Sequence, residues 1–188
     1  MKAYIHLAAV GMRTEPSHRS EMVNQMLAGE TATIVESREE WTLLQSDYDG
    51  YQGWVSNLQF TPFKDPADLA EHLFLGTPYL WGGRSTGGID CSGLTQVCFK
   101  AAGIWLPRDA WQQATAGREV CLCNVQRNDL AFFHNSEGCI VHVGICLGDR
   151  RIIHASGRVR IDTLDNQGIY IEQEKRYSHS LHGLRRIE

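Results

Sequence analysis

The sequence predicts an α+β protein in which a small β-barrel precedes a domain of helices and an antiparallel sheet. Three observations carry this prediction. Residues 1–60 contain short strand-like runs separated by turns. A helical pattern begins at Asp65-Pro66, and strand-like runs return from Leu130 onwards. Helices followed by strands is an α+β order, so we place a boundary between residues 1–60 and residues 61–188.

The N-terminal part is expected to contain short strands bounded by turn residues. The turn Asp47-Tyr48-Asp49-Gly50 separates the last two of them. The segment from Ser20 to Gly29 is expected to form one helical turn or a long loop. The expected strands are Tyr4–Val10, Thr31–Glu36, Trp41–Gln45 and Tyr51–Val55. Together they outline a small β-barrel.

Two helices are expected next. Asp65 can cap a helix whose first position is Pro66 and whose end is Gly76. Its Leu69, His72 and Leu73 share one face. The second helix follows from the helical spacing of Leu94, Val97, Cys98, Ala101 and Ala102, with Gly103 as the left-handed residue after its end. Cys91 then lies in the first helical turn, and Asp90 precedes it as the N-cap.

The sheet is expected from three runs, namely Leu130–Phe133, Cys139–Leu147 and Arg151–Ala155. Gly148-Asp149 makes a tight turn between the last two, so they should pair as antiparallel neighbours. This pairing would bring His142 and His154 within reach of each other.

Composition and charge exclude several function classes. A formal charge of −4 and a pI near 6.1 provide no basic face for nucleic acid or anionic lipid. No transmembrane stretch or signal peptide is recognised, so we expect a cytoplasmic monomer with no membrane partner, or a periplasmic or exported protein if a leader has been trimmed. Six cysteines in a chain of this size are expected to be free thiols in a reducing compartment.

The sequence indicates nucleophilic catalysis by a cysteine, without a cofactor. A thiol attacks a carbonyl only as its thiolate, so the pKa of Cys91 should be lowered. Unpaired N–H groups and the positive end of the helix dipole would lower it, whereas the charge of Asp90 opposes this. One histidine, His142 or His154, would serve as base and the other would fix its tautomer and orientation.

Five segments carry a family resemblance: Tyr79-Leu80-Trp81-Gly82-Gly83, Gly88-Ile89-Asp90-Cys91-Ser92-Gly93-Leu94, Asp129-Leu130-Ala131-Phe132-Phe133, His142-Val143-Gly144-Ile145 and Ile152-Ile153-His154-Ala155. In this order they resemble the NlpC-type, papain-like peptidases that cut bacterial cell-wall peptides. The resemblance implies Cys91 as nucleophile, His142 as base and His154 as orienting residue. It also implies that Tyr79 and the backbone N–H of Cys91 support the oxyanion. Asn128 stands where the family has glycine, and asparagine tolerates the left-handed conformation that this turn requires.

A narrower resemblance concerns the substrate. Residues 1–60 resemble a bacterial SH3-like domain, in Met12-Arg13-Thr14-Glu15-Pro16-Ser17 and in Asp49-Gly50-Tyr51-Gln52-Gly53-Trp54-Val55. Joined to this catalytic type, they resemble the γ-D-glutamyl-L-diamino acid endopeptidases, which act on freed peptidoglycan stem peptides. The resemblance implies that acidic and aromatic groups hold the free amine of an N-terminal L-alanine. The candidate binding residues are Asp90, Ser92, Glu15, Tyr51, Trp81 and Arg108, with Glu21 as a weaker acidic candidate.

Three alternatives stay open at this point. The same scaffold can host an amidase or endopeptidase that acts on intact peptidoglycan, since fold does not fix substrate. A non-catalytic module that binds wall fragments is another possibility. A metal site made by Cys121, Cys123, His134 and Cys139 is conceivable, although these residues lack the paired spacing of a zinc motif.

Overall fold

The structure is a computed structural model that describes residues 1–187. It divides into two compact units, of which the first comprises Met1–Lys64 and the second begins at Asp65. The division lies four residues beyond the boundary expected from the sequence, at the start of the first helix.

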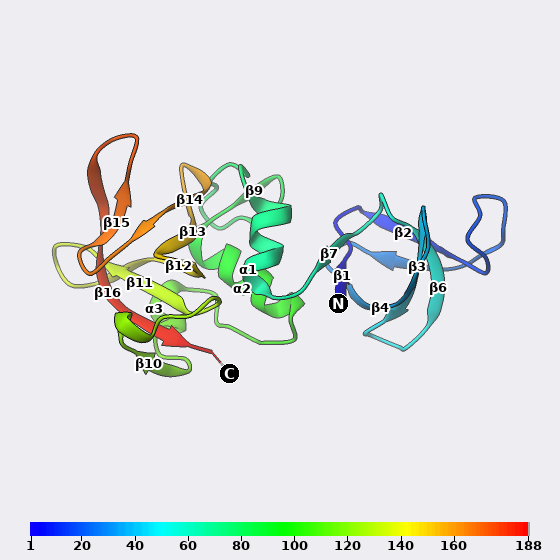
Figure 1. Ribbon diagram of the computed structural model, residues 1–188, viewed down its shortest axis with the longest axis horizontal. Coiled ribbons are helices and arrows are strands. Elements are labelled where there is room, and N and C mark those ends of the chain that lie inside the picture. Colours follow the sequence, from blue (N-terminus) through cyan, green and yellow to red (C-terminus); the bar gives the residue numbers. More distant parts are fainter. Residues whose placement is uncertain (188) are drawn as a thin grey trace. The chain divides into compact units, whose positions relative to one another are not determined.

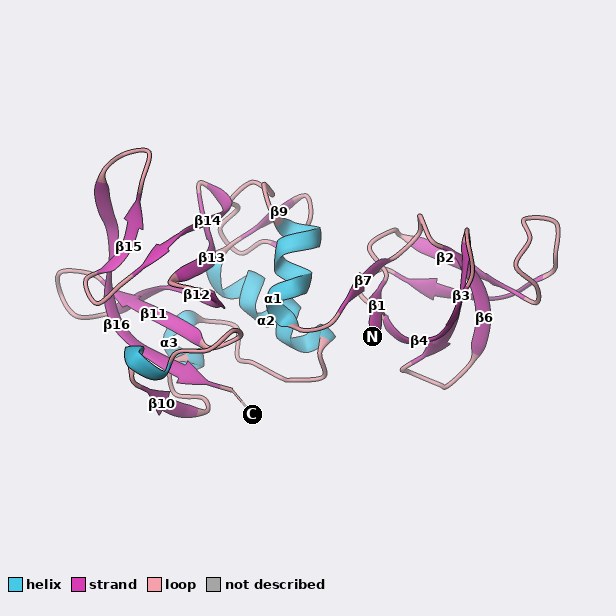
Figure 2. Ribbon diagram, in the orientation of Figure 1, coloured by secondary structure: helices cyan, strands magenta, loops and turns pink. Residues whose placement is uncertain are grey.

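The regular elements of the first unit are strands, joined by loops and turns (Figure 2). They form one antiparallel sheet in the order β3-β2-β6-β5-β4-β1-β7. Its core is apolar and includes the fully buried Ile5, Met12, Leu44 and Val55. The strands are β1 (Lys2–Tyr4), β2 (Ala9–Arg13), β3 (Met22–Leu27), β4 (Thr31–Ser37), β5 (Trp41–Ser46), β6 (Gln52–Ser56) and β7 (Thr61–Phe63).

Two expectations for this unit were wrong. A single strand was expected over Tyr4–Val10, but the chain turns a corner there, held by hydrogen bonds from Ile5 N–H to the carbonyl of Glu30 and from Gly29 N–H to the carbonyl of Ile5. The segment Ser20–Gly29, expected as a helical turn or loop, contains β3, which pairs with β2 along its length. Its apolar residues do not alternate, so the pairing with β2, rather than its own pattern, makes it a strand.

The second unit begins with helices whose ends follow local rules. Asp65 caps α1 (Pro66–Leu69) by accepting a hydrogen bond of 2.8 Å from Asp68 N–H, and Pro66 is the first helical residue, as expected. The helix continues as the π-helical segment η1 (Ala70–Phe74), which ends before Gly76. His72 does not share the buried face, because its side chain is exposed and pairs with Asp68. The remaining helical elements are α2 (Cys91–Ala101), α3 (Ala110–Gln113) and the 3₁₀ turn η2 (Leu122–Asn124).

The sheet of the second unit is antiparallel and closes into a barrel. Its order is β10-β16-β11-β12-β13-β14-β15, and β15 also pairs with β16, so that β11 to β16 form a ring. A separate short pair, β8 (Arg84–Ser85) and β9 (Gly88–Ile89), precedes α2. The strands of the main sheet are β10 (Arg118–Val120), β11 (Leu130–His134), β12 (Ile140–Gly148), β13 (Arg151–Ser156), β14 (Arg158–Leu164), β15 (Gly168–Ile171) and β16 (Arg176–Arg186).

The packing of α2 on the barrel positions the candidate nucleophile. This helix contacts β12 and β13, the two strands that carry the candidate histidines (Figure 1). Cys98 on its inner face is fully buried, as expected of a packing residue. Asn128 has a φ of 72°, which confirms the left-handed turn expected before β11. None of the described helices is long and apolar enough to cross a membrane.

The expectation of six free thiols was wrong for two of them. Cys121 and Cys123 form a disulfide, whereas Cys91, Cys98, Cys139 and Cys146 are free. The turn into η2 brings the Cα atoms of the pair to 5.3 Å, well within the range that a disulfide spans.

Candidate active site

Cys91 is the first residue of α2, where the helix leaves its amide groups unpaired. Asp90 has extended backbone angles and caps the helix by accepting a 2.7 Å hydrogen bond from Gly93 N–H. The thiol is buried, with 7% of the residue exposed, and the backbone N–H groups of Val143, Ser92 and Cys91 itself are directed at its sulfur. Val143 follows His142 in β12, so the nucleophile lies beside the strand of its expected base.

Burial raises the pKa of the Cys91 thiol above its ordinary value, and the nearby Asp90 carboxylate adds to this, while the three backbone N–H groups act against it. The sequence had led us to expect a lowered pKa. The N–H groups at the helix start lower the pKa of the thiol, as predicted, but removal of the thiol from water raises it by more. In the free protein the sulfur is therefore a thiol at neutral pH.

The antiparallel pairing of β12 and β13 brings the two histidines together, as expected. Gly144 stands opposite His154, and Nε2 of His142 lies 2.8 Å from Nδ1 of His154 in the barrel interior. His142 is 5% exposed and His154 is fully buried. Burial, together with the neighbouring His179 and His154, holds the pKa of His142 well below its usual range. His142 is thus a neutral imidazole, able to accept a proton.

Gly144 makes room for this contact. A Cβ atom at this position would lie 2.9 Å from Cβ of His154 and 2.7 Å from Cδ1 of Ile152. The close cross-strand approach of His154 therefore requires a residue without a side chain at position 144.

Two residues near the histidines were missed by the sequence analysis. Asp162 of β14 places Oδ2 at 3.0 Å from Nε2 of His154. His179 of β16 stacks on His142, with ring centroids 4.1 Å apart and an interplanar angle of 19°. Both belong to strands that the sequence analysis did not assign. The alternation of charged and apolar residues over Arg158–Leu164 is a signal that could have found β14.

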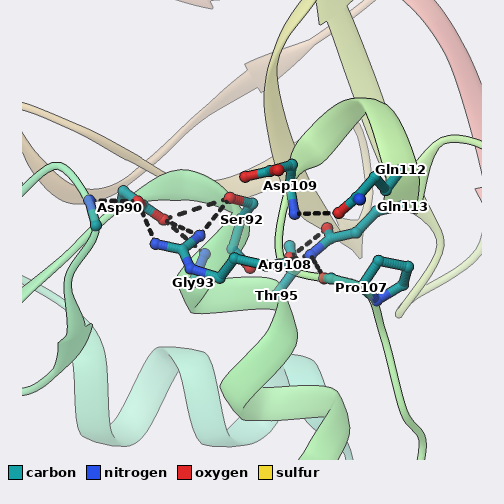
Figure 3. Close-up of polar contacts among 10 residues, drawn as sticks. Asp90, Ser92, Gly93, Thr95, Pro107, Arg108, Asp109, Gln112 and Gln113 are labelled. Atoms are coloured by element: carbon teal, nitrogen blue, oxygen red, sulfur yellow. Dashed lines mark hydrogen bonds and ion pairs between the residues drawn. The ribbon is translucent and has the colours of Figure 1, made fainter.

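Asp90 and Arg108 form the main ion pair of the site (Figure 3). The guanidinium donates from Nη1 to Oδ1 at 3.0 Å and from Nη2 to Oδ2 at 2.6 Å. Oδ2 also accepts from Gly82 N–H at 2.8 Å, and Nη1 of Arg108 donates to the Ser92 hydroxyl at 2.8 Å. The oxygens of Asp90 are thus fully engaged in the free protein, which differs from the open carboxylate expected for an incoming amine.

Gln113 of α3 fixes the loop that carries Arg108 (Figure 3). Its side-chain amide donates to the carbonyls of Ser92 and Pro107 at 3.0 and 2.9 Å, and its oxygen accepts from the Thr95 hydroxyl at 2.7 Å. Gln113 and Thr95 are completely buried. Because all these groups are satisfied, the loop and the start of α2 form one rigid wall.

A pocket of about 640 Å³ opens at the thiol. It contains most of the residues that the sequence analysis selected from the second unit, including Tyr79, Asp90 and Arg108. Burial, with the adjacent Cys91 and Asp90, raises the pKa of Tyr79, so its hydroxyl remains a donor at neutral pH. The lining residues are Tyr79, Trp81, Gly82, Asp90, Cys91, Ser92, Arg108, Asp109, Ala110, Trp111, Ile140 and Val141.

The candidates from the barrel of the first unit lie on its surface. Glu15 is exposed in the connection between β2 and β3, and Tyr51 is 41% exposed just before β6. Glu21 is likewise exposed. These positions are accessible to a ligand, and their role as a substrate clamp stays a prediction.

The alternative metal site is not formed. Cys121 and Cys123 are bonded to each other, and His134 uses Nδ1 in a contact with the carbonyl of Asn135. Among the described residues, the group whose donor atoms converge consists of His142, His154 and His179, within 4.8 Å of one another. Both nitrogens of His154 and Nε2 of His142 already take part in hydrogen bonds, which is the arrangement of a proton relay.

Comparison with known sequences agrees with this geometry. The profile of the NlpC/P60 family matches residues 76–179, more than half of the chain. The chain belongs to the NlpC/P60 family. A second profile, described as the bacterial dipeptidyl-peptidase Sh3 domain, matches residues 12–59. The α+β catalytic domain preceded by an SH3-like barrel, expected from the sequence, is thereby confirmed.

Individual relatives point in the same direction. The γ-D-glutamyl-L-lysine dipeptidyl-peptidase of Bacillus subtilis is 49% identical over 85 residues, which cover 44% of this chain and 29% of that protein. The protein of the same name from Bacillus cereus is 39% identical over 118 residues, covering 60% and 35%. The chain thus spans about a third of the length of these curated relatives. A crystal structure of an NlpC/P60 family protein from Bacillus cereus matches 98% of this chain and 62% of its own, at 26% identity and a TM-score of 0.61.

Proposed function

We propose that this protein is a cysteine peptidase that hydrolyses the bond between γ-D-glutamate and an L-diamino acid in freed peptidoglycan stem peptides with an N-terminal L-alanine. The observation that carries the proposal is the buried thiol of Cys91, which starts a helix, lines a pocket and lies against the backbone N–H of Val143. Val143 follows His142 in β12, and the ring of His142 is hydrogen-bonded to that of His154. This combination suits attack on an amide carbonyl.

The first step begins from a neutral pair, because the pKa of Cys91 is raised and that of His142 is lowered. Nε2 of His142 is occupied by His154, which leaves Nδ1 as the ring nitrogen that can face the thiol. As the sulfur forms its bond to the carbonyl carbon, the thiol proton passes to His142. Proton transfer coupled to attack avoids a buried thiolate in the resting enzyme.

The tetrahedral intermediate places a negative charge on the former carbonyl oxygen. The backbone N–H of Cys91, at the start of α2, would serve as one donor to this oxygen, and the Tyr79 hydroxyl, which also lines the pocket, as a second. His142 then gives its proton to the nitrogen of the diamino acid, and the C–N bond breaks to leave a thioester. A water molecule, deprotonated by His142, hydrolyses the thioester and restores the thiol.

The charges that line the pocket fit a peptide with a free amine and a free α-carboxylate. A γ-linked D-glutamate retains its α-carboxylate, and the guanidinium of Arg108 lies in the pocket wall to pair with it. Asp90 and Asp109 also line the pocket, so these three groups sum to a charge of −1, which favours an ammonium group. Because Asp90 is saturated by its present partners, the amine would share it with Arg108.

The names of the relatives support recognition of a free amino terminus in the substrate. A dipeptidyl-peptidase removes two residues from a free amino terminus, and the relatives from both Bacillus species carry that name with a γ-D-glutamyl-L-lysine specificity. The profile that matches residues 12–59 is also described by a dipeptidyl-peptidase. Glu15, Tyr51 and Trp81 are proposed as further contacts to the N-terminal residue.

The test compares L-Ala-γ-D-Glu-L-Lys with the same peptide acetylated on alanine. We expect the free peptide to give L-Ala-D-Glu and lysine by mass spectrometry, and the acetylated peptide to remain intact. Cys91→Ala should abolish the reaction. Equal cleavage of both peptides, or release of fragments from intact peptidoglycan at the same rate, would contradict the requirement for a free amine.

A further inference from the structure

Behind the two histidines lies a carboxylate that the proposed mechanism does not yet use. Asp162 sits on β14, and its side chain is 7% exposed. Its Oδ2 lies 3.0 Å from Nε2 of His154, on the side of that ring opposite to His142. A buried carboxylate in this position either stabilises the barrel alone or determines how the histidines carry their protons.

The hydrogen bonds determine the tautomer of His154 first, through Asp162, and then that of His142. An ionised carboxylate only accepts, so when His154 carries a single ring proton, the contact with Asp162 requires that proton to be on Nε2. Nδ1 of His154 is then a bare acceptor, and the 2.8 Å contact requires a proton on Nε2 of His142. Nδ1 of His142 is left without a proton, which is the state that a base facing Cys91 needs.

We propose that Asp162 is a positioning residue of the catalytic relay: it fixes the tautomer of His154 and, through it, leaves Nδ1 of His142 free to accept the thiol proton. The inference rests on the proposed function. When His142 becomes protonated, the same carboxylate stabilises the positive charge across the intervening ring. Without Asp162, both histidines could reverse their tautomers, and a proton on Nδ1 of His142 would face the thiol.

Arg160 of the same strand keeps this carboxylate ionised and in place. Its Nε lies 2.6 Å from Oδ2, and its Nη2 donates to Oδ1 at 2.9 Å. Burial acts to raise the pKa of Asp162, but the contacts with His154 and Arg160 outweigh it and hold the pKa below the ordinary value. Arg160 also stands opposite His154 in the pairing of β13 with β14, so the strand register brings all three groups to one end of the barrel.

His179 completes the surroundings of the relay. It stacks on His142 at 4.1 Å and packs against His154 at 5.9 Å between ring centroids. Burial, followed by the charges of His154 and Arg176, lowers the pKa of His179 to about 4, against the opposing effect of Asp162. His179 is therefore neutral under ordinary conditions, and Asp162 is the anion bonded to His154, with Arg160 and Arg176 as nearby cations.

Two variants of the full chain and one control test the proposal. Asp162→Leu is close in size and accepts no hydrogen bond, whereas Asp162→Asn retains an amide oxygen that can accept from His154. Asp165→Asn is the matched control, because Asp165 lies one residue beyond the same strand and bonds Tyr177 and Arg150, outside the relay. We expect Asp162→Leu to lower kcat on the order of 10- to 1000-fold with KM nearly unchanged. Asp162→Asn should be affected less, and Asp165→Asn should match the parent protein.

A readout independent of substrate separates this role from a structural one and from the proposed function. In ¹⁵N-labelled protein, nitrogen chemical shifts report which ring nitrogen carries the proton. We expect the Nε2–H tautomer for His142 and His154 in the parent, and loss of it in Asp162→Leu with the spectrum otherwise retained. If both tautomers persist in Asp162→Leu, or if kcat is unchanged, the proposal is wrong. If Asp162→Leu does not fold, the test passes to Asp162→Asn, which lacks the negative charge that stabilises protonated His142. A kcat of Asp162→Asn as high as that of Asp165→Asn would then equally overturn the proposal.

Discussion

Replacement of Asp90 by asparagine tests the most densely bonded group of the site. The carboxylate accepts from Gly93 N–H, Gly82 N–H and both terminal nitrogens of Arg108, at 2.6 to 3.0 Å. Asparagine is as good an N-cap as aspartate, so the bond to Gly93 is retained. The side-chain amide group of the asparagine, however, would face the N–H of Gly82 and Nη2 of Arg108, and all three groups are donors.

The magnitude follows from the lost bonds. One charge-assisted hydrogen bond to Arg108 and one bond from Gly82 are removed, each worth about 1 to 3 kcal/mol. The side chain of Arg108 is 31% exposed, so water compensates part of its loss. We expect the free energy of unfolding of the second unit to fall by about 2 to 3 kcal/mol, and activity to fall as well, because Arg108 is no longer held in the pocket wall.

The assay is a urea titration of the parent, Asp90→Asn, Arg108→Met and the double variant at pH 7. Each transition is followed by hydrogen exchange of amides in α2, which reports on the second unit alone. The double variant should lose less than the sum of the single losses, since the pair acts as a unit. A loss below about 0.5 kcal/mol for Asp90→Asn, or strict additivity, would refute the reasoning.

The pH dependence of the same difference gives a second check on the ion pair. Burial acts to raise the pKa of Asp90, but the bonds from Arg108, Gly93 and Gly82 prevail and hold it below its ordinary value. The folded state thus binds the proton less readily than the unfolded state. The stabilising contribution of Asp90 is present above the unfolded pKa and is lost as the pH falls through the folded pKa. The difference in the free energy of unfolding between the parent and Asp90→Asn should therefore become smaller at acid pH.

Further outcomes concern the thiol and the histidines. Cys98→Ala should retain activity, because Cys98 is a packing residue on the buried face of α2, whereas Cys91→Ala should have none. A comparable loss in both variants would contradict the choice of nucleophile. Gly144→Ala should lower kcat at least 10-fold, because the added methyl group displaces His154. An unchanged rate would show that the barrel accommodates the methyl group without moving His154. The rate at which iodoacetamide alkylates Cys91 should still increase with pH above the ordinary thiol pKa, since the pKa of Cys91 is raised and His142 is neutral. A rate that is already maximal at pH 6 would indicate a thiolate–imidazolium pair in the resting protein.

Local rules explain what the sequence could predict. The N-cap of Asp65, the helix that starts at Cys91 and the hairpin between β12 and β13 each depend on residues close together in the chain. Their pattern was visible, and the contact between His142 and His154 followed from it. The helix start at the candidate nucleophile Cys91 and the contact between the two candidate histidines could thus be predicted from the sequence.

The remainder of the site depends on register and burial, which single-sequence patterns do not encode. Asp162 reaches His154 because β14 pairs with β13 in one particular register, and His179 reaches His142 because the barrel closes. Arg108 meets Asp90, 18 residues earlier in the chain, through a loop that Gln113 fixes by hydrogen bonds to the carbonyls of Ser92 and Pro107. The raised pKa of Cys91 was missed for a similar reason, because desolvation depends on the whole fold and exceeds the local effect of the helix start.

The closure of the barrel by β16 also governs when the protein can become active. Cys91 and its helix are synthesised well before β16, but β16 supplies the partner strand for both β11 and β15. Until it pairs, the interior that holds His142, His154 and Asp162 is open to water, and their hydrogen bonds compete with solvent. A nascent chain would therefore carry its nucleophile for some time without a working base, which delays hydrolytic activity until folding of the second unit is nearly complete.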